Sequence, residues 1–151
     1  RLTRIPAPIC TQISIAELFT DLKKLFPEEE FQFEVPTPEL KLNADRTQIE
    51  QILINLLKNA REACSRKSDK KIQVKARKLS AGNTTLTISD NGEGILPDVL
   101  DKIFVPFFTT KTSGSGIGLS LCKQIMTLHE GSINVKSEVG KGSCFILTFP
   151  K

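Results

Sequence analysis

The sequence predicts an α+β fold in which a mixed sheet carries helices on one face. Three stretches repeat apolar residues at helical spacing, and they are separated by short segments in which apolar and polar residues alternate. Several of these segments follow one another across short turns, which favours antiparallel pairs over a doubly wound parallel sheet. At 151 residues, the chain has the size of one globular domain.

The first predicted elements are a strand and a helix. Residues 8–13 predict a short edge strand, after which Ser14 begins the helix. Ser14 and Glu17 have capping-box spacing, so the hydroxyl and the carboxylate can each satisfy a free backbone N–H. Apolar residues recur at helical spacing up to Phe26, and Pro27 ends the run.

The next elements are two short strands and a long helix. Residues 31–35 alternate in polarity and predict a strand, and residues 40–43 predict another. A helix follows over 45–64, where Asp45 and Gln48 again have capping-box spacing in front of a long apolar stripe.

The remaining predicted elements lie in the part of the chain that contains the glycines. Residues 71–79 and 84–89 alternate on either side of a turn that contains Gly82, which predicts a hairpin. We expect a loop-rich stretch over 90–115, a helix over 116–129 and two last strands over 132–137 and 143–149. Eight of the nine glycines lie between Gly92 and Gly142, so this half holds the sharp turns and close approaches.

Composition narrows the function classes. A net charge of +4 allows an anionic ligand but lacks the clustered positive charge of a nucleic-acid binder. No apolar run is long enough for a membrane helix, and the chain opens without an apolar signal segment or an initiator Met, so we expect a fragment of a longer protein.

The cysteines and the histidine exclude further chemistries. The four cysteines show no zinc spacing, so we interpret them as free core thiols in a reducing compartment. A single histidine, His129, disfavours a Ser-His-Asp triad and a histidine metal cluster, and its place at a helix end predicts a cationic cap.

A polar ridge runs along the second predicted helix beside its apolar stripe. Its members are Gln48, Gln51, Asn55, Asn59 and Glu62. Asn55 and Asn59 lie one turn apart, and their neutral amide oxygens suit a hard cation such as Mg²⁺ that phosphates also hold. The alternative is a ridge that simply faces water.

An acidic, glycine-containing turn follows the predicted strand 84–89. Asp90 could accept a hydrogen bond from an exocyclic amine such as that of adenine, and Gly92 and Gly94 could let a ligand approach the backbone. The alternative is an Asx turn, since Asp, Asn and Gly are all turn residues.

A second glycine cluster, residues 114–119, opens the last predicted helix. Backbone N–H groups at a helix start form an anion site that the helix dipole favours for phosphate. The spacing differs from a dinucleotide fingerprint, and Gly142 interrupts the P-loop order in Gly140–Ser143. A flexible loop before a helix is the alternative.

A phenylalanine-rich stretch, residues 103–111, precedes that cluster. Phe104, Phe107 and Phe108 form either a plug over the core or a mobile lid and partner-docking surface. Lys111 at its end could reach a phosphate as a point charge.

In this order, these stretches resemble the N, G1, F, G2 and G3 boxes of the sensor histidine kinase family over residues 9–150. The corresponding segments are 55–60, 90–94, 104–108, 114–118 and 140–143. The resemblance implies the Bergerat fold, a two-layer α/β sandwich with a mixed, mostly antiparallel sheet. Residues 1–151 would form a single catalytic, ATP-binding domain, with 1–8 as the linker from an absent dimerisation and phosphoacceptor domain.

The resemblance also implies a function. The domain would bind ATP or ADP with Mg²⁺ and donate the γ-phosphate to a histidine on the dimerisation and histidine-phosphotransfer domain, from which a response regulator takes it. Since neither the acceptor histidine nor the general base lies in this chain, no catalytic residue is expected here. We expect a cytoplasmic domain, monomeric in isolation, of a parent that is membrane-anchored or soluble.

Site residues follow from the matched boxes. Asn59 and Asn55 would hold Mg²⁺, and Asp90 would accept from the adenine amine. The other expected ATP-binding residues are Gly92, Gly94, Ile95, Ile103, Thr110, Lys111, Gly114, Ser115, Gly116, Ile117, Gly118, Leu119 and Ser143. Glu62 stands where many relatives have a phosphate-binding residue, so Arg61 or Lys58 could take that part.

Three other functions remain open. A same-fold ATPase would need a glutamate where Asn55 stands, because an amide cannot take a proton from water. A same-fold serine kinase is a further alternative, although the extended phenylalanine-rich stretch favours the histidine kinases. The last alternative is a nucleotide-binding or docking module that transfers no phosphate.

Overall fold

The structure is a computed structural model that describes residues 4–108 and 118–151. Within these residues, the helices are α1 (Ile15–Leu25), α2 (Arg46–Ala63), α3 (Pro97–Leu100) and α4 (Gly118–Leu128). The strands are β1 (Thr11–Ser14), β2 (Phe31–Glu34), β3 (Lys41–Ala44), β4 (Ile72–Lys78), β5 (Thr84–Asp90), β6 (Ser132–Glu138) and β7 (Gly142–Phe149). Of these elements, only the short helix α3 was not expected, because it lies in the stretch predicted to be loop.

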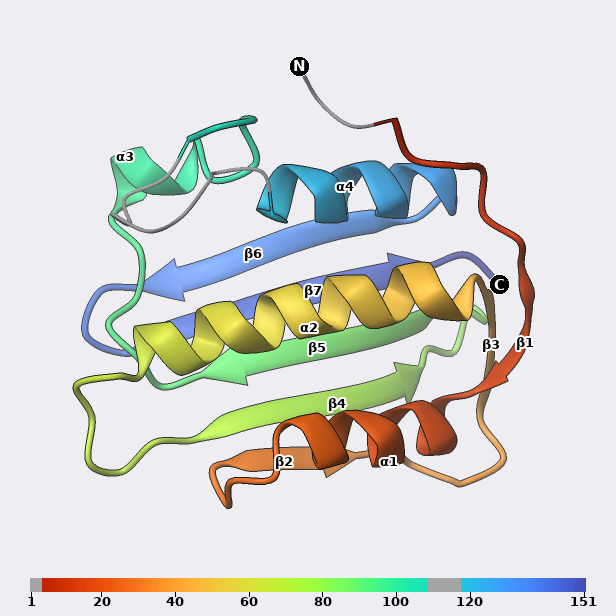
Figure 1. Ribbon diagram of the computed structural model, residues 1–151, viewed down its shortest axis with the longest axis horizontal. Helices are drawn as coiled ribbons and strands as arrows, with labels where there is room; N and C mark the ends of the chain where they lie inside the picture. Colours follow the sequence, from red (N-terminus) through yellow and green to blue (C-terminus); the bar gives the residue numbers. More distant parts are fainter. Residues whose placement is uncertain (1–3, 109–117) are drawn as a thin grey trace.

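The main sheet has the predicted mixed character. Within the described residues it has five strands in the order β2-β4-β5-β7-β6, and β1 pairs with β3 in a separate two-stranded sheet. The pair β2–β4 is parallel, and the pairs β4–β5, β5–β7 and β6–β7 are antiparallel. The hairpin of β4 and β5 is therefore confirmed, as is the α+β fold class (Figure 1).

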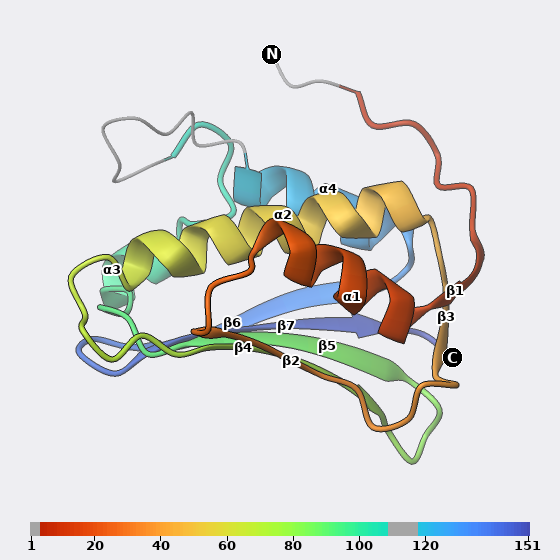
Figure 2. The same ribbon diagram turned by 60° about the horizontal axis from the view of Figure 1, so that its bottom comes forward.

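The helices form one layer. Figure 2 shows α1, α2 and α4 on the same side of the main sheet, and none of the described helices lies on the other side. Alternate residues of β4, such as Val74, are buried in the same core as fully buried residues of α2 such as Leu53 and Leu57. The apolar stripe of the long helix is thus the middle of the core.

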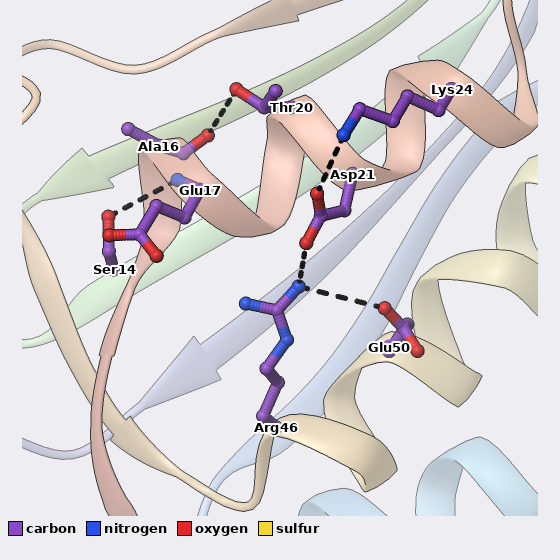
Figure 3. Close-up of polar contacts among 8 residues, drawn as sticks. All are labelled: Ser14, Ala16, Glu17, Thr20, Asp21, Lys24, Arg46 and Glu50. Atoms are coloured by element: carbon purple, nitrogen blue, oxygen red, sulfur yellow. Dashed lines mark hydrogen bonds and ion pairs between the residues drawn. The ribbon is translucent and has the colours of Figure 1, made fainter.

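Polar contacts join α1 to α2 at the surface (Figure 3). The N–H of Glu17 donates to the Ser14 hydroxyl at 3.2 Å, which confirms the hydroxyl half of the predicted capping box. Arg46 pairs with Asp21 of α1 and with Glu50 of its own helix. These side chains are about one-third to one-half exposed, so the pairs stabilise the fold by about 1 kcal/mol at most.

The segment before β1 is tied to the start of α2. The N–H of Ile9 donates to Asp45 Oδ2 at 2.9 Å, and Gln48 Nε2 donates to the carbonyl of Pro6 at 2.9 Å. Gln48 is buried, so the alternative of a water-facing polar ridge was wrong for this residue. Its side chain instead holds the segment before β1 against α2.

His129 joins the end of α4 to the same region. Its Nδ1 lies 2.9 Å from the carbonyl of Ile125, and its Nε2 accepts from the N–H of Asp45 at 3.1 Å. Since a backbone N–H can only donate, Nε2 must carry a lone pair, and the uncharged tautomer satisfies both contacts. The contact with a helix-end carbonyl agrees with a cap, but the predicted cationic form does not fit this pattern.

The four cysteines all lie in the described residues, and each is a free thiol. Cys64 and Cys122 are buried, whereas Cys144 is half-buried and Cys10 is exposed, so the expectation of four core thiols was wrong for Cys10. In the described part of the chain, no helix combines the length and the apolar character needed to span a bilayer.

Candidate functional site

A cross-strand row of polar residues closes one end of the main sheet. Asp90 on β5 lies opposite Ser143 on β7, which lies opposite Ser137 on β6. In this register the row continues the inward-facing rows of the core, so its side chains point toward the helix layer. The sheet therefore presents one carboxylate and two hydroxyls side by side at the end of β5.

Asp90 is mostly buried at this position. Burial raises the pKa of its carboxyl above the ordinary value, and hydrogen bonds from the N–H groups of Gly92 and Ser143 act in the opposite direction. The Gly92 N–H lies 2.9 Å from Asp90 Oδ1, which is the geometry of an Asx turn. The Asx-turn interpretation is thus correct, and it also fixes the orientation of the carboxylate.

The glycines after Asp90 touch other backbone segments. A Cβ on Gly92 would lie 2.5 Å from the carbonyl oxygen of Ala63, and a Cβ on Gly94, where φ is +78°, would lie 2.3 Å from that of Glu138. These positions require glycine because the protein backbone itself fills the space, an explanation that differs from the approach of a ligand expected from the sequence.

The turn between β6 and β7 locks onto the same loop. A Cβ on Gly142 would lie 2.0 Å from the carbonyl oxygen of Asp90, and Gly140 donates its N–H to the carbonyl of Glu93 at 2.9 Å. The loop after β5 is thus held between the end of α2 and this turn. The two glycine motifs form one interlocked unit that holds Asp90 in place.

Asn91, beside Asp90, was not predicted as a site residue. Its Oδ1 accepts from the N–H of Lys71 at 2.9 Å and its Nδ2 donates to the carbonyl of Asp69 at 2.8 Å, which fastens the α2–β4 connection to the loop. The Cys64 thiol also approaches Asn91 Oδ1 at 3.6 Å, and burial together with the charge of Asp90 raises the pKa of that thiol. The Asp-Asn-Gly turn signal marks this residue, but its partners are distant in sequence.

Asn55 and Asn59 are half-buried on α2. Asn55 Oδ1 lies only 2.6 Å from where a Cβ would stand on Gly118, so its amide oxygen faces the start of α4. Asn59 lies one turn before Ala63, which meets Gly92 in the loop after Asp90. The long helix thus links two predicted motifs, the Asp90 loop and the beginning of α4.

Arg61 does not belong to this group. Its guanidinium lies 4.9 Å from the ring centre of Phe26 and 5.3 Å from that of Phe31, and it pairs with Glu28 at 2.9 Å. The expectation that Arg61 could replace the missing phosphate contact at Glu62 was therefore wrong, because the side chain is held against the α1–β2 connection.

The phenylalanine-rich stretch divides between core and surface. Ile103 is buried, and Phe104 is half-buried with Lys123 of α4 5.4 Å from its ring centre. Phe107 is 56% exposed at a positive φ of +67°, an uncommon conformation for a bulky residue. Phe104 therefore fits a plug over the core, whereas Phe107 presents an exposed apolar ring.

The remaining expected residues divide as follows. Ile95 and Leu119 are half-buried against the core, Ser143 is buried and Phe108 is half-buried. The expected residues Thr110, Lys111, Gly114, Ser115, Gly116 and Ile117 lie outside the described residues.

Ser137, like Asn91, was not predicted from the sequence. Its Oγ accepts from the N–H of Ile95 at 2.8 Å and contacts Ser143 Oγ at 2.8 Å, so it joins the loop after Asp90 to β7. No motif marks a serine in a strand, and only the pairing of β6 with β7 places it in the row with Asp90.

Comparison with known proteins identifies the family. A family model described as histidine kinase-, DNA gyrase B-, and HSP90-like ATPase matches residues 44–151. The chain is 43% identical over 109 residues to the histidine-protein kinase AtoS of Escherichia coli, which is 72% of this chain and 18% of AtoS. It is 40% identical over 110 residues to the sensor histidine kinase ZraS of Salmonella typhimurium, which is 73% of this chain and 23% of ZraS.

One solved structure matches this chain both in fold and over nearly its whole length. The nucleotide-free catalytic domain of histidine kinase ThkA matches with a TM-score of 0.82 at 36% identity, over 94% of this chain and 95% of that domain. The chain spans less than a quarter of the two curated kinases but nearly all of the ThkA domain. It therefore belongs to the histidine kinase-like ATPase family, as a catalytic domain of the sensor histidine kinase type.

Proposed function

We propose that this domain binds ATP with Mg²⁺ and presents the γ-phosphate to a histidine on a separate helical domain of its parent kinase. One observation carries the proposal: α2, which bears Asn55 and Asn59, meets the loop of Asp90 at one end and the start of α4 at its middle. The amide oxygens for a cation thus lie on one helix, which meets the loop that follows the carboxylate for a base and, at its middle, a helix start that favours phosphate.

Asp90 supplies base recognition in this proposal. A carboxylate oxygen accepts from the exocyclic amine of adenine, whereas guanine presents an oxo group at the equivalent position and would be repelled. Ile95 and Ile103 would form apolar walls for the ring. ShkA, a protein of the same fold at 24% identity and a TM-score of 0.82, was crystallised with the ATP analogue AMPPNP.

Asn55 and Asn59 fit a Mg²⁺ site by donor chemistry. Both are half-buried and carry neutral oxygens, and Mg²⁺ in such sites keeps some of its ligands as phosphates and water. When bound, the ion would neutralise phosphate charge. The part of the protein is to hold the triphosphate in a fixed position, which is the main protein contribution to phosphoryl transfer.

The acceptor would come from outside this chain. We propose that a dimerisation and histidine-phosphotransfer domain docks near the exposed Phe107, and that a response regulator takes the phosphate from that domain. The ThkA kinase, which matches at 32% identity and a TM-score of 0.75 over 42% of its chain, was crystallised with the response regulator TrrA. The free thiols and the use of ATP favour a cytoplasmic location.

A binding titration tests the nucleotide half of the proposal. A fluorescent ADP analogue is titrated with and without Mg²⁺ and then displaced with ATP or GTP. Displacement by ATP but not by GTP is expected; no saturable binding would contradict the proposal.

Two variants locate the metal dependence. Asn59→Ala is expected to lose the Mg²⁺-dependent part of nucleotide binding while its circular dichroism is unchanged. Asn134→Ala, an exposed asparagine on β6, is the matched control and is expected to bind as wild type. Wild-type affinity in Asn59→Ala would refute the metal assignment.

Transfer is tested separately. The domain, loaded with labelled ATP, is mixed with a helical acceptor domain of a related kinase. Label on the acceptor histidine supports the kinase function, and bound nucleotide without any label would identify a binding module instead.

A further inference from the structure

Three oxygen atoms and one amide meet at Ser137. Its Oγ accepts from the N–H of Ile95 at 2.8 Å, lies 3.1 Å from the carbonyl oxygen of Gly142 and lies 2.8 Å from Ser143 Oγ. Ser137 is half-buried and Ser143 is buried, so water competes little for these contacts.

The number of protons decides how these contacts are made. A serine hydroxyl has one proton to donate, and the Gly142 carbonyl can only accept. If Ser137 gave its proton to Ser143, two lone pairs would face each other over the 3.1 Å to Gly142. The proton of Ser137 therefore goes to Gly142, and Ser143 must donate its own proton to Ser137.

This arrangement determines what Ser143 can offer a ligand. With its proton engaged by Ser137, Ser143 Oγ has only lone pairs left, and the neighbouring carboxylate of Asp90 also accepts hydrogen bonds. The end of the sheet thus presents an edge of acceptors. An amine, with N–H groups to donate, suits such an edge, whereas an oxo group does not.

We infer that Ser137 is a positioning residue for nucleotide-base specificity: it holds the Ser143 hydroxyl as an acceptor beside Asp90, and it holds the Ile95 loop against the same edge. The inference rests on the proposed function and deepens it. Ser137 touches neither the base nor the phosphates in this account, since it acts through Ser143 and Ile95.

The test is the ratio of the GDP and ADP dissociation constants of the full chain, measured by displacement of a fluorescent ADP analogue. In Ser137→Ala, the Ser143 proton is released and can turn to donate to the oxo group of guanine. We expect the preference for ADP over GDP to fall about tenfold, which corresponds to about 1.4 kcal/mol. Ser137→Thr keeps the hydroxyl and is expected to restore the wild-type ratio.

Two further variants separate specificity from structure. Ser89→Ala removes another strand hydroxyl, which donates to Cys144 Sγ at 3.3 Å on the outer face, and it is expected to leave the ratio unchanged. Adding Ser143→Ala to Ser137→Ala removes the released hydroxyl and is expected to weaken GDP binding again.

The ADP and GDP affinities of wild type and Ser137→Ala distinguish a role in base specificity from a purely structural role. An equal loss of ADP and GDP affinity in Ser137→Ala, with an unchanged ratio, would show a purely structural role and overturn the inference. A wild-type chain that binds neither nucleotide would overturn the proposed function and, with it, this inference. A wild-type chain that binds ADP while Ser137→Ala keeps the wild-type ratio overturns the inference alone.

Discussion

The Asp90 carboxylate combines a cost in folding free energy with the role in base recognition proposed above. Its burial raises the pKa of the carboxyl, which means that the ionised form is less favourable in the folded protein than in the unfolded chain. The two backbone N–H groups that it accepts from recover only part of this cost. Asp90 therefore lowers the stability of the fold near neutral pH, and stability alone does not explain its presence at this position.

The variant Asp90→Asn is expected to lose nucleotide affinity while gaining stability near neutral pH. A hydrogen bond to a charged group contributes about 1.5–3 kcal/mol, so the loss of affinity for ADP should be about 10-fold to 100-fold. Isothermal titration measures the affinity, and urea unfolding measures the stability. A variant that is both weaker in binding and less stable would contradict this account.

The stability of Asp90→Asn relative to wild type should depend on pH. A carboxyl with a raised folded pKa binds more protons in the folded state, so wild type loses stability as the pH rises from the ordinary value of 3.8 through the folded pKa. Below 3.8 both states are protonated and this difference disappears. The advantage of Asp90→Asn should therefore grow as the pH rises through this window and reach its full size above the folded pKa.

Two glycines with positive φ, Gly140 and Gly142, differ in what surrounds them. Gly140 and Gly142 have φ of +84° and +127°, but a Cβ on Gly140 meets nothing within 4 Å, whereas one on Gly142 meets the carbonyl of Asp90. Gly140→Ala should cost about 1–2 kcal/mol from the left-handed conformation alone. Gly142→Ala should cost more than about 3 kcal/mol, because the backbone must also move.

Thermal and urea unfolding of the two alanine variants check this difference. Equal losses at both positions would show that backbone angle, and not the contact with the Asp90 loop, determines the need for glycine.

At the element scale, the start of α2 joins the incoming chain to the core. Asp45 caps the helix by accepting from the N–H of Gln48 at 3.2 Å, and its other oxygen accepts from the N–H of Ile9. The Ile9 hydrogen bond is the largest cause that lowers the pKa of Asp45; burial acts in the opposite direction, and hydrogen bonds from the N–H groups of Gln48 and Thr47 lower it further. One carboxylate therefore serves both a helix and the segment before β1.

Replacing Asp45 should lower the stability of the fold by an amount that depends on pH. Asp45→Ala is expected to lose about 1 kcal/mol or more at pH 7, as is typical of a lost N-cap. Because the folded pKa is lowered, this contribution is present above the unfolded value of 3.8 and is lost as the pH falls through the folded pKa. Wild type and Asp45→Ala should thus become more alike in acid; a difference that stays constant with pH would refute the charge-based part.

The phenylalanine-rich stretch gives a prediction with an internal control. Phe107→Ala removes an exposed side chain, so it should leave stability within about 0.5 kcal/mol and ADP affinity unchanged, while phosphotransfer to an acceptor domain falls. Phe104→Ala removes a half-buried ring in contact with Lys123, so its main effect should be lower stability. If Phe107→Ala weakens ADP binding and transfer equally, the docking role is wrong.

Across the whole molecule, local sequence patterns predicted nearly all of the described helices and strands. The helix stripes, the alternation in β4 and β5 and the turn residues between them depend on neighbours in sequence, and these elements are present. The parallel pairing of β2 with β4 could not be predicted in this way, because it joins segments on either side of α2.

The candidate site shows the same division. The sequence identified Asp90, Asn55 and Asn59 as residue types at characteristic spacing. It could not place Ser137 beside Ser143, bury Gln48 under Pro6 or direct Arg61 to Phe26, because these contacts depend on tertiary packing. At Gly92 and Gly94 the sequence pattern predicted a close approach correctly but not its cause, since the backbone that fills the space is remote in sequence.

The open side of the sheet supports a prediction about assembly. Its outward residues are polar along β4, with Gln73, Lys75 and Arg77, and Lys23 Nζ donates to the carbonyl of Phe31 at 2.8 Å at the start of the edge strand β2. A charged donor on an edge carbonyl discourages pairing with another sheet. We expect a single species of 16.7 kDa in sedimentation velocity over a wide range of concentrations, and a concentration-dependent dimer would contradict this.

The interlocked glycines have a consequence for recognising lost activity among descendants of this domain. Gly92, Gly94 and Gly142 let backbone segments meet, so a lineage that no longer used nucleotide would still be selected to keep them as long as it folded. Asp90 has the opposite position, since drift to a neutral residue would relieve a buried charge. A related domain that has lost nucleotide binding should therefore keep the glycine motifs but have another residue in place of Asp90. The glycines would then indicate a shared fold, whereas the carboxylate would indicate that nucleotide binding is retained.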